Sequence, residues 1–139
     1  MTYSLKIEFI RASEEDAKKF VEVQDKAFYS DYIKYGVCPG YGRNVESITE
    51  SMKRNVVFKI VADGEVVGKV SAKNNEYDEG HLDCLCIIPE YENKGIGQKA
   101  VAFIEKQFDD VKKWLLETPV DKLRNHLMIM VQELLNEYL

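Results

Sequence analysis

Two glycines at the start of a predicted helix are the residues best placed to do chemistry. Gly95 and Gly97 follow a polar bend, with Lys94 in front of them and Gln98-Lys99 behind. The amides in the first turn of a helix have no acceptor within the helix, and the helix dipole adds positive potential, so such a turn attracts anions. Glycine also permits positive φ angles and close approach to the backbone. The spacing therefore predicts an anion-binding loop.

Two phosphate-binding patterns can be compared with this loop. A P-loop needs G-x-x-x-x-G-K-[ST], and Gln98 after the second glycine excludes it. The dinucleotide pattern G-x-G-x-x-A matches Gly95 to Ala100, and Glu117 follows about 20 residues on. Against it, Pro89 to Lys94 separate the strand from the glycines, and little chain remains for a substrate domain. A dinucleotide-binding domain stays a remote alternative.

The cysteines could be imagined as part of a metal site. Three cysteines are an odd number and predict no disulfide framework. Cys84 and Cys86 lie two apart in an apolar run, where a strand would place both on one side as small core residues. Together with His81 they lack the paired C-x-x-C spacing that would support a fourth ligand. We therefore expect no metal site.

The first half of the chain predicts one strand and two helices. Alternating hydrophobic residues indicate a strand over Ser4 to Ile10. Ser13, with Asp16 three residues on, can cap a helix that helical spacing extends to about Tyr29. The next segment is rich in Gly and Tyr and predicts a loop, after which Asn44 can cap a shorter helix.

The second half predicts an antiparallel meander followed by one crossover. Two β-branched runs around Asp63-Gly64 indicate a hairpin, and a further strand runs from His81 to Ile88. A helix over Gln98 to Phe108 leads to a strand over Lys112 to Glu117, and the last two strands should be parallel neighbours. A helical pattern from Leu123 to Leu139 follows. The order β-α-α-β-β-β-α-β-α predicts an α/β (α+β) fold with a mixed central sheet in one domain, residues 1–139.

The composition limits the class of partner. The chain is 45% hydrophobic and 31% charged, which is typical of a globular domain. Its net charge of -5 argues against a nucleic acid or an anionic membrane as the main partner. No apolar run approaches membrane-spanning length, and the first residues alternate rather than form a signal segment. We expect a cytoplasmic protein with no nucleic-acid and no membrane partner.

The segment from Leu82 to Gly97 closely resembles the acetyl-coenzyme A signature of the GNAT superfamily of N-acetyltransferases. It reads L-x-x-L-x-I-x-P-E-Y and then E-N-K-G-I-G. The element order is similar to that fold as well, so the resemblance covers about residues 5 to 125. The family's loop pattern is [Q/R]-x-x-G-x-[G/A], and Glu92 replaces the usual Gln or Arg. Because backbone amides do the binding, this change weakens the match without removing the site.

The resemblance implies acetyl-CoA as cosubstrate, bound mainly by backbone groups. In the family, the strand before the loop pairs with the pantetheine arm, a role that falls here to Leu85, Cys86 and Ile87. An asparagine that contacts the cofactor matches Asn125. The amides that would hold the pyrophosphate belong to the loop residues Asn93, Lys94, Gly95, Ile96, Gly97 and Gln98.

The resemblance also implies direct attack of a primary amine, of a small molecule or a peptide, on the thioester. The amine must lose a proton, so a carboxylate serves as base, sometimes through water. Glu117, ending the strand beside the cofactor strand, matches a catalytic Glu of relatives. Asp83, which should face opposite to Cys84, is the second candidate. Either could instead be a solvated strand-end carboxylate, and a non-catalytic acyl-CoA-binding domain is the alternative function.

The acceptor is not specified by the sequence. Family members build its site around the first two helices, where four tyrosines surround Cys38-Pro39-Gly40. They could line an acceptor mouth, or simply pack the loop in place. A net acidic surface favours a cationic amine. These tyrosines are Tyr29, Tyr32, Tyr35 and Tyr41.

After Asn125 the chain departs from the family pattern. The family's F-Y-x-x-x-G-F segment, whose tyrosine acts as the acid, and its last strand are both missing from HLMIMVQELLNEYL. We interpret this as an atypical or truncated C-terminal end, produced by truncation or a reading-frame change near codon 126. The apolar face of Leu123 to Leu139 needs a partner. A homodimer through this helix would supply one, and folding back over its own sheet is the alternative.

Overall fold

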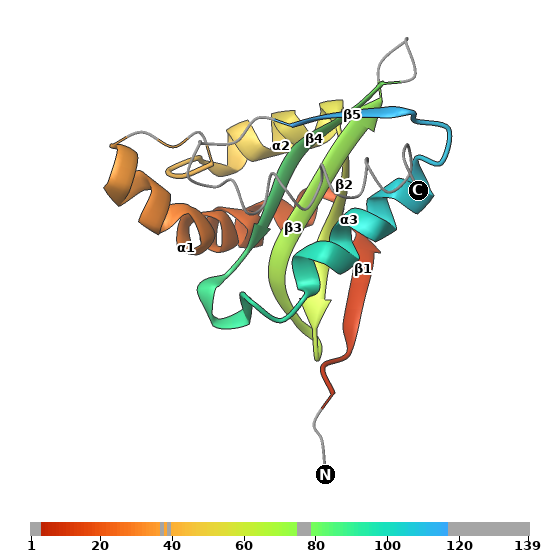
Figure 1. The fold of residues 1–139 in the computed structure, drawn as a ribbon. Helices are drawn as coiled ribbons and strands as arrows, with labels where there is room; N and C mark the ends of the chain where they lie inside the picture. The colour runs from red at the N-terminus through yellow and green to blue at the C-terminus, as the bar shows by residue number, and fades with distance from the viewer. Residues whose placement is uncertain (1–3, 37, 39, 75–78, 117–139) are drawn as a thin grey trace.

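The computed structural model describes residues 4–36, 38, 40–74 and 79–116. Five strands form one sheet in the order β1-β2-β3-β4-β5, antiparallel except for the parallel pair of β4 and β5 (Figure 1). The predicted α/β fold, its mixed sheet and its element order are confirmed as far as β5. The elements are β1 (Ile7–Arg11), η1 (Glu14–Asp16), α1 (Ala17–Tyr35), α2 (Val45–Arg54), β2 (Val56–Ala62), β3 (Glu65–Asn74), β4 (Glu79–Ile87), η2 (Pro89–Tyr91), α3 (Ile96–Gln107) and β5 (Lys113–Leu116).

Helices cover both faces of the sheet, α1 and α2 on one and α3 on the other (Figure 1). On the α3 face, Phe103 stacks on Phe9 with ring centroids 4.8 Å apart and meets Phe58 edge-on. On the other face, Phe20 and Val57 pack together in a second buried cluster. Since neighbouring strand residues point to opposite faces, Phe58 and Val57 divide β2 between the two layers.

Two local predictions are confirmed by the backbone. Asp63 and Gly64 have φ angles of 49° and 84°, as the two central residues of a type I′ hairpin turn require. Asn44 caps α2, because its Oδ1 accepts a hydrogen bond from the Ser47 amide at 2.8 Å. The hairpin turn and the helix cap both lie where the sequence places them.

The first helix is longer than the sequence predicted. It continues through the first part of the tyrosine-rich segment, so the residues from Tyr29 to Tyr35 are helical rather than part of the loop. The helix ends at Gly36, whose φ of 74° and amide bond to the Tyr32 carbonyl, 2.8 Å, form a left-handed C-cap. At its start, the Ser13 amide donates to Asp16 Oδ2 at 2.9 Å, but this contact caps the turn η1 ahead of the helix.

Several other boundaries move by a few residues. Strand β1 begins at Ile7 rather than Ser4, and β4 begins at Glu79 rather than His81. Helix α3 begins at Ile96 rather than Gln98, which places Gly97 inside its first turn. The predicted helix from Leu123 to Leu139 lies outside the described residues.

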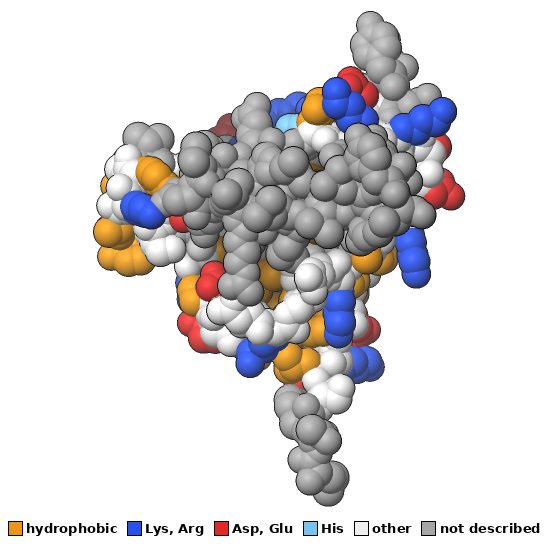
Figure 2. Space-filling view, viewed as in Figure 1, with side chains coloured by type: hydrophobic (Ala, Val, Ile, Leu, Met, Phe, Trp, Pro, Cys, Tyr) orange, Lys and Arg blue, Asp and Glu red, His pale blue; other side chains and the backbone are white. Residues whose placement is uncertain are grey.

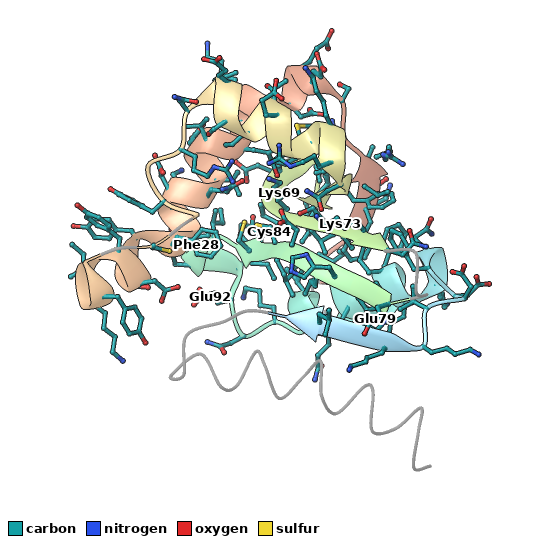
Figure 3. The ribbon with its side chains drawn as sticks, turned by 90° about the horizontal axis from the view of Figure 1, so that it is seen from above. Phe28, Lys69, Lys73, Glu79, Cys84 and Glu92 are labelled. Carbon is teal, nitrogen blue, oxygen red and sulfur yellow. The ribbon has the colours of Figure 1, made fainter. Side chains whose placement is uncertain are left out.

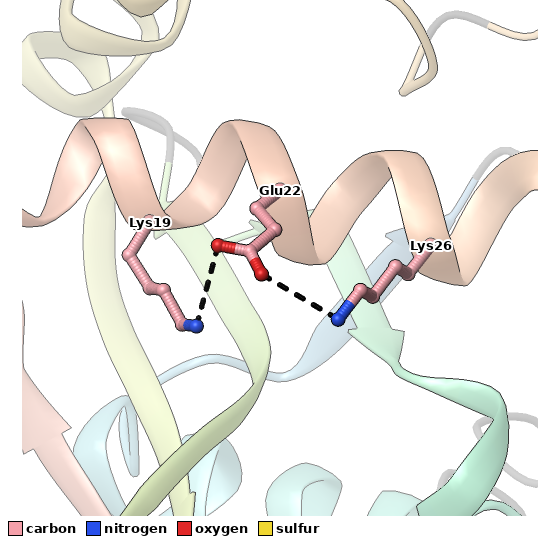
Figure 4. A network of polar contacts seen from close by, with 3 residues as sticks. All are labelled: Lys19, Glu22 and Lys26. Carbon is pink, nitrogen blue, oxygen red and sulfur yellow. Dashed lines mark hydrogen bonds and ion pairs between the residues drawn. The ribbon is translucent and has the colours of Figure 1, made fainter.

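The outer face of α1 carries an exposed ion-pair network. Glu22 lies between Lys19, at 3.4 Å, and Lys26, at 3.5 Å (Figure 4). The two ammonium groups, Lys19 first, lower the pKa of Glu22. Exposed pairs of this kind contribute little to stability because water and salt screen them. Among the helices in the described ranges, none is long and apolar enough to cross a membrane.

Candidate functional site

The loop before α3 has the backbone of an anion site. Asn93 and Gly95 both have positive φ angles, 61° and 78°, and Gly95 is the N-cap of the helix. The first hydrogen bond of the helix runs from the Lys99 amide to the Gly95 carbonyl, at 3.2 Å. The amides of the residues between them therefore have no acceptor within the helix. The positive φ that glycine permits is found at Gly95, and the binding of an anion stays a prediction.

The two glycines of this loop differ in why glycine suits their position. A Cβ on Gly95 would meet nothing within 4 Å, so backbone conformation, rather than space, favours glycine there. Gly97 is the second residue of the helix, and its φ angle is not positive. Its backbone conformation therefore does not require glycine, and what distinguishes it is the absence of a side chain. Ile96 beside it is 2% exposed and anchors the helix start to the core. The amides are thus held on a packed element.

The second half of β4 has a free edge within the described residues. Strand β3 pairs with β4 along its length, whereas the described residues of β5 pair with Glu79 to Leu82. From Asp83 to Ile87, no strand among the described residues lies on the β5 side. The backbone of Leu85, Cys86 and Ile87, predicted to pair with an extended ligand, belongs to this edge. The edge leads directly into η2 and the glycine loop.

Asp83 is the extra residue of a β-bulge. The register passes from Ser71 opposite Cys84 to Ala72 opposite Leu82, so Asp83 has no partner of its own on β3. The Ser71 hydroxyl lies 3.4 Å from Asp83 Oδ2. Because Ser71 and Cys84 share a face, the Asp83 carboxylate turns to that face too. The prediction that Asp83 faces opposite to Cys84 was wrong, since the bulge breaks the alternation of the strand.

A groove of about 590 Å³ opens beside the loop. Two basic residues, Lys94 and Lys99, and the acidic Glu90 are among the residues that line it. Figure 2 shows basic and hydrophobic side chains close together on the lower part of this face. The sequence interpretation did not select Lys99, although its place in the first turn of the helix could have indicated it. The lining residues are Ser4, Leu5, Ile7, Glu90, Tyr91, Lys94, Ile96 and Lys99.

The tyrosines near the end of α1 partly pack on one another. Tyr32 stacks on Tyr41 with centroids 4.4 Å apart, and Tyr29 lies 6.1 Å from the same ring. Tyr29 is nevertheless 54% exposed. The loop is pinned to α1, because Gln24 Nε2 donates to the Gly40 carbonyl at 3.0 Å. The cluster therefore combines a packing role with an exposed aromatic surface.

The structure brings some predicted site residues together and does not describe others. The loop Asn93 to Gln98 and the edge Leu85 to Ile87 lie at the same end of β4. Asp83 follows Leu82, the last β4 residue for which pairing with β5 is described. Glu117 and Asn125 lie outside the described residues, so their roles stay predictions.

Comparison with known proteins identifies the class. Residues 11–128 match the model of the acetyltransferase (GNAT) family. This match spans well over half of the chain, and the chain belongs to that family. Among curated protein sequences, none matches it.

Solved structures share the fold. An acetyltransferase from Thermus thermophilus is 17% identical, with 88% of this chain and 84% of that one covered and a TM-score of 0.70. The PaiA N-acetyltransferase from Thermoplasma acidophilum, in complex with coenzyme A, is 22% identical, with 77% and 73% covered and a TM-score of 0.58. The microcin C7 self-immunity acetyltransferase MccE, in complex with acetyl-CoA and AMP, is 13% identical, with 90% and 76% covered and a TM-score of 0.69. At these identities the likeness concerns the fold.

Proposed function

We propose that this protein is an acetyl-CoA-dependent N-acetyltransferase that moves an acetyl group to a primary amine of a small molecule or peptide. The observation that carries the proposal is the continuity of two features among the described residues, the β4 edge beyond the last described pair with β5 and a helix start whose first amides have no acceptor within the helix. An extended pantetheine arm needs the first and a pyrophosphate needs the second. Family membership and the CoA-bound structures of the same fold support it.

The proposed binding groups are mostly backbone. Leu85, Cys86 and Ile87 would pair with the pantetheine arm, and the amides from Asn93 to Gln98 would hold the pyrophosphate. The ammonium groups of Lys94 and Lys99 in the adjoining groove favour the same negative charge. Asn125 would contact the cosubstrate as its counterpart does in the family.

The proposed chemistry is direct attack of the amine on the acetyl carbonyl. A carboxylate must take the proton, and Glu117 is the first candidate with Asp83 the second. The bulge supports Asp83 in this role, because it turns the carboxylate out of the strand's alternation, next to the last described pair of β4 and β5. Asp83 is exposed, so water can link it to an acceptor.

Ligand-dependent stability tests the proposal. At 100 times Kd, CoA or acetyl-CoA should stabilise the protein by about 2.7 kcal/mol, while NAD should not. Release of free CoA thiol should then follow when amines are added. Absence of a shift with CoA removes the proposal, and a shift with NAD alone restores the dinucleotide alternative. Stabilisation without thiol release across a panel of amines favours a non-catalytic acyl-CoA-binding domain.

A homodimer through the predicted helix from Leu123 to Leu139 is part of the proposal, as is a cytoplasmic location. A helix of that length is marginal unless it packs on a partner, and two-fold association provides one. Light scattering should give twice the chain mass of 16.1 kDa. Changing Leu134 and Leu135 to Glu should return the monomer mass. A monomer in the unchanged protein defeats the dimer.

A further inference from the structure

A buried lysine and two cysteines form a cluster between β3, β4 and α1. Lys69 on β3 is only 2% exposed, and its Nζ lies 2.8 Å from Gln24 Oε1. The same ammonium lies 5.2 Å from the centroid of the Phe20 ring. These contacts hold a positive charge in the core with a neutral hydrogen-bond acceptor and an aromatic face. Such a charge favours a negative group close by.

Both cysteines of β4 face this charge. Cys86 is opposite Lys69 in the sheet register, and Cys84 is opposite Ser71, two residues along the same face. Figure 3 shows Cys84 between Lys69 and Phe28 of α1. Cys86 is 5% exposed, whereas Cys84 is only half-buried. Of the two residues, Cys84 is therefore the more exposed.

The two thiols ionise unequally. The hydrogen bond from Cys86 lowers the pKa of the Cys84 thiol, and the charges of Lys69 and Arg43 act in the same direction. Burial and the Asp83 carboxylate oppose this, but do not reverse it. As the donor to Cys84, Cys86 has its own pKa raised well above the ordinary value. The pair therefore loses its first proton at Cys84.

We propose that Cys84 is an acyl-acceptor site at which the protein acetylates itself from bound acetyl-CoA. The inference rests on the proposed function, because it needs the thioester at the β4 edge. Cys84 immediately precedes Leu85, the first residue of the edge assigned to the pantetheine arm, so the proposal places the thioester beside the residue that carries this thiol. Cys38 lies in the loop between α1 and α2, and its described contacts include no second thiol and no ammonium group.

The chemical step is an exchange between two thioesters. The Cys84 thiolate attacks the acetyl carbonyl carbon, a new C–S bond forms at Sγ, and the C–S bond to CoA breaks. CoA leaves as its thiolate and takes a proton from water, replacing the one that Cys84 lost to water. No oxidant or reductant is needed, and one thioester replaces another. A thiolate with a lowered pKa is the appropriate nucleophile.

Mass spectrometry of the whole protein tests this site. Incubation with acetyl-CoA should add one acetyl group, which hydroxylamine removes as expected for a thioester, and peptide mapping should place it on Cys84. Cys84→Ala should abolish the adduct, while Cys38→Ala should keep it. An adduct on Cys38 or Cys86, or none while CoA binds by thermal shift, overturns this inference alone. Absence of CoA binding overturns the proposed function and this inference with it.

A second measurement tests why Cys84 reacts. The rate of alkylation of Cys84 by iodoacetamide should rise with pH as the thiol ionises. Cys86→Ala and Lys69→Met each remove a contribution that lowers the Cys84 pKa, so the midpoint should move to higher pH in both. The Cys38 alkylation profile serves as the internal control. Unchanged Cys84 midpoints in folded Cys86→Ala and Lys69→Met proteins contradict the activation by this cluster.

Discussion

The two halves of strand β4 differ in what lies beside them. From Glu79 to Leu82 the strand is paired on both sides, by β3 and by β5. From Asp83 to Ile87 it is paired by β3 alone within the described residues. The bulge at Asp83 lies next to the last described pair of β4 and β5, and the loop that holds the helix start follows the second half.

On the proposed function, stability and binding are separated along one strand. A strand edge without a partner is a liability that soluble proteins normally cover. In the proposal, an extended, negatively charged ligand covers the edge that leads into the helix start. The first half would close the sheet, and the second half would offer backbone groups to the ligand.

The largest expected effect is on the free energy of unfolding, and it compares how tightly the two halves of β4 are packed. A Cβ at Gly68 would lie 2.4 Å from the Cys86 carbonyl oxygen, whereas one at Gly80 would meet the Trp114 ring at 2.6 Å. A paired backbone cannot move as a side chain can. We expect Gly68→Ala to lower the free energy of unfolding by about 3 kcal/mol and Gly80→Ala by about 1 kcal/mol, the two ends of the range for overpacking. Urea unfolding measures both, and the reverse order contradicts this view of the second half.

The next effect concerns the base at the boundary. Glu117→Gln should leave CoA affinity unchanged and lower turnover by about a hundredfold, the lower end for a general base. Asp83→Asn is the matched variant and should have the smaller effect. Steady-state thiol release measures both. If Asp83→Asn has the larger effect, the base is the bulge residue, and if neither changes turnover, both are solvated carboxylates.

The helix start should govern affinity rather than stability. Gly97→Val covers first-turn amides with a branched side chain, and we expect CoA affinity to fall at least tenfold, about 1.4 kcal/mol. Glu46→Val is the matched control, because it changes the second residue of α2 in the same way. Calorimetric titration with CoA should show a loss only for Gly97→Val. Equal affinity in the two variants would place the anion elsewhere.

The smallest expected effect is also on stability, and it concerns a site outside β4. Asp16 and Lys59 form an ion pair there, with the two charged groups 3.1 Å apart. Burial opposes ionisation of Asp16, but hydrogen bonds from the Ser13 backbone and Lys59 prevail and lower its pKa below the ordinary value of 3.8. The stabilisation is thus present above pH 3.8 and is lost as pH falls through the lower, folded pKa. We expect Asp16→Asn to cost roughly 0.5–1 kcal/mol at neutral pH. In pH-dependent unfolding, a difference that persists in strong acid would contradict this origin.

Local signals in the sequence predicted most of the fold. The φ preferences of Asp63 and Gly64 are enough to predict the hairpin turn. The side chain of Asn44 is enough to predict the cap of α2. The end of α1 was misplaced because Tyr residues resemble a loop composition, while the residue that stops the helix is Gly36. Propensity could not show that the intervening residues remain helical.

The candidate site was predicted in part. The loop from Asn93 to Gln98 is specified by neighbouring residues, so its geometry could be anticipated. The bulge at Asp83 depends on pairing with Ser71, far away in the sequence, and reversed the expected direction of the carboxylate. Lys69 was not singled out, because a lysine on a hairpin strand gives no sign in sequence that it will be buried.

Hydrogen exchange along β4 tests the central claim most directly. Peptides covering Glu79 to Leu82 should exchange equally slowly with and without CoA, because both edges are already paired. Peptides covering Asp83 to Ile87 and the loop Asn93 to Gln98 should become protected when CoA is added at saturating concentration. Protection in these two segments alone is the predicted result. Bound CoA that leaves both segments unprotected would contradict the assignment of this edge and loop to the cosubstrate.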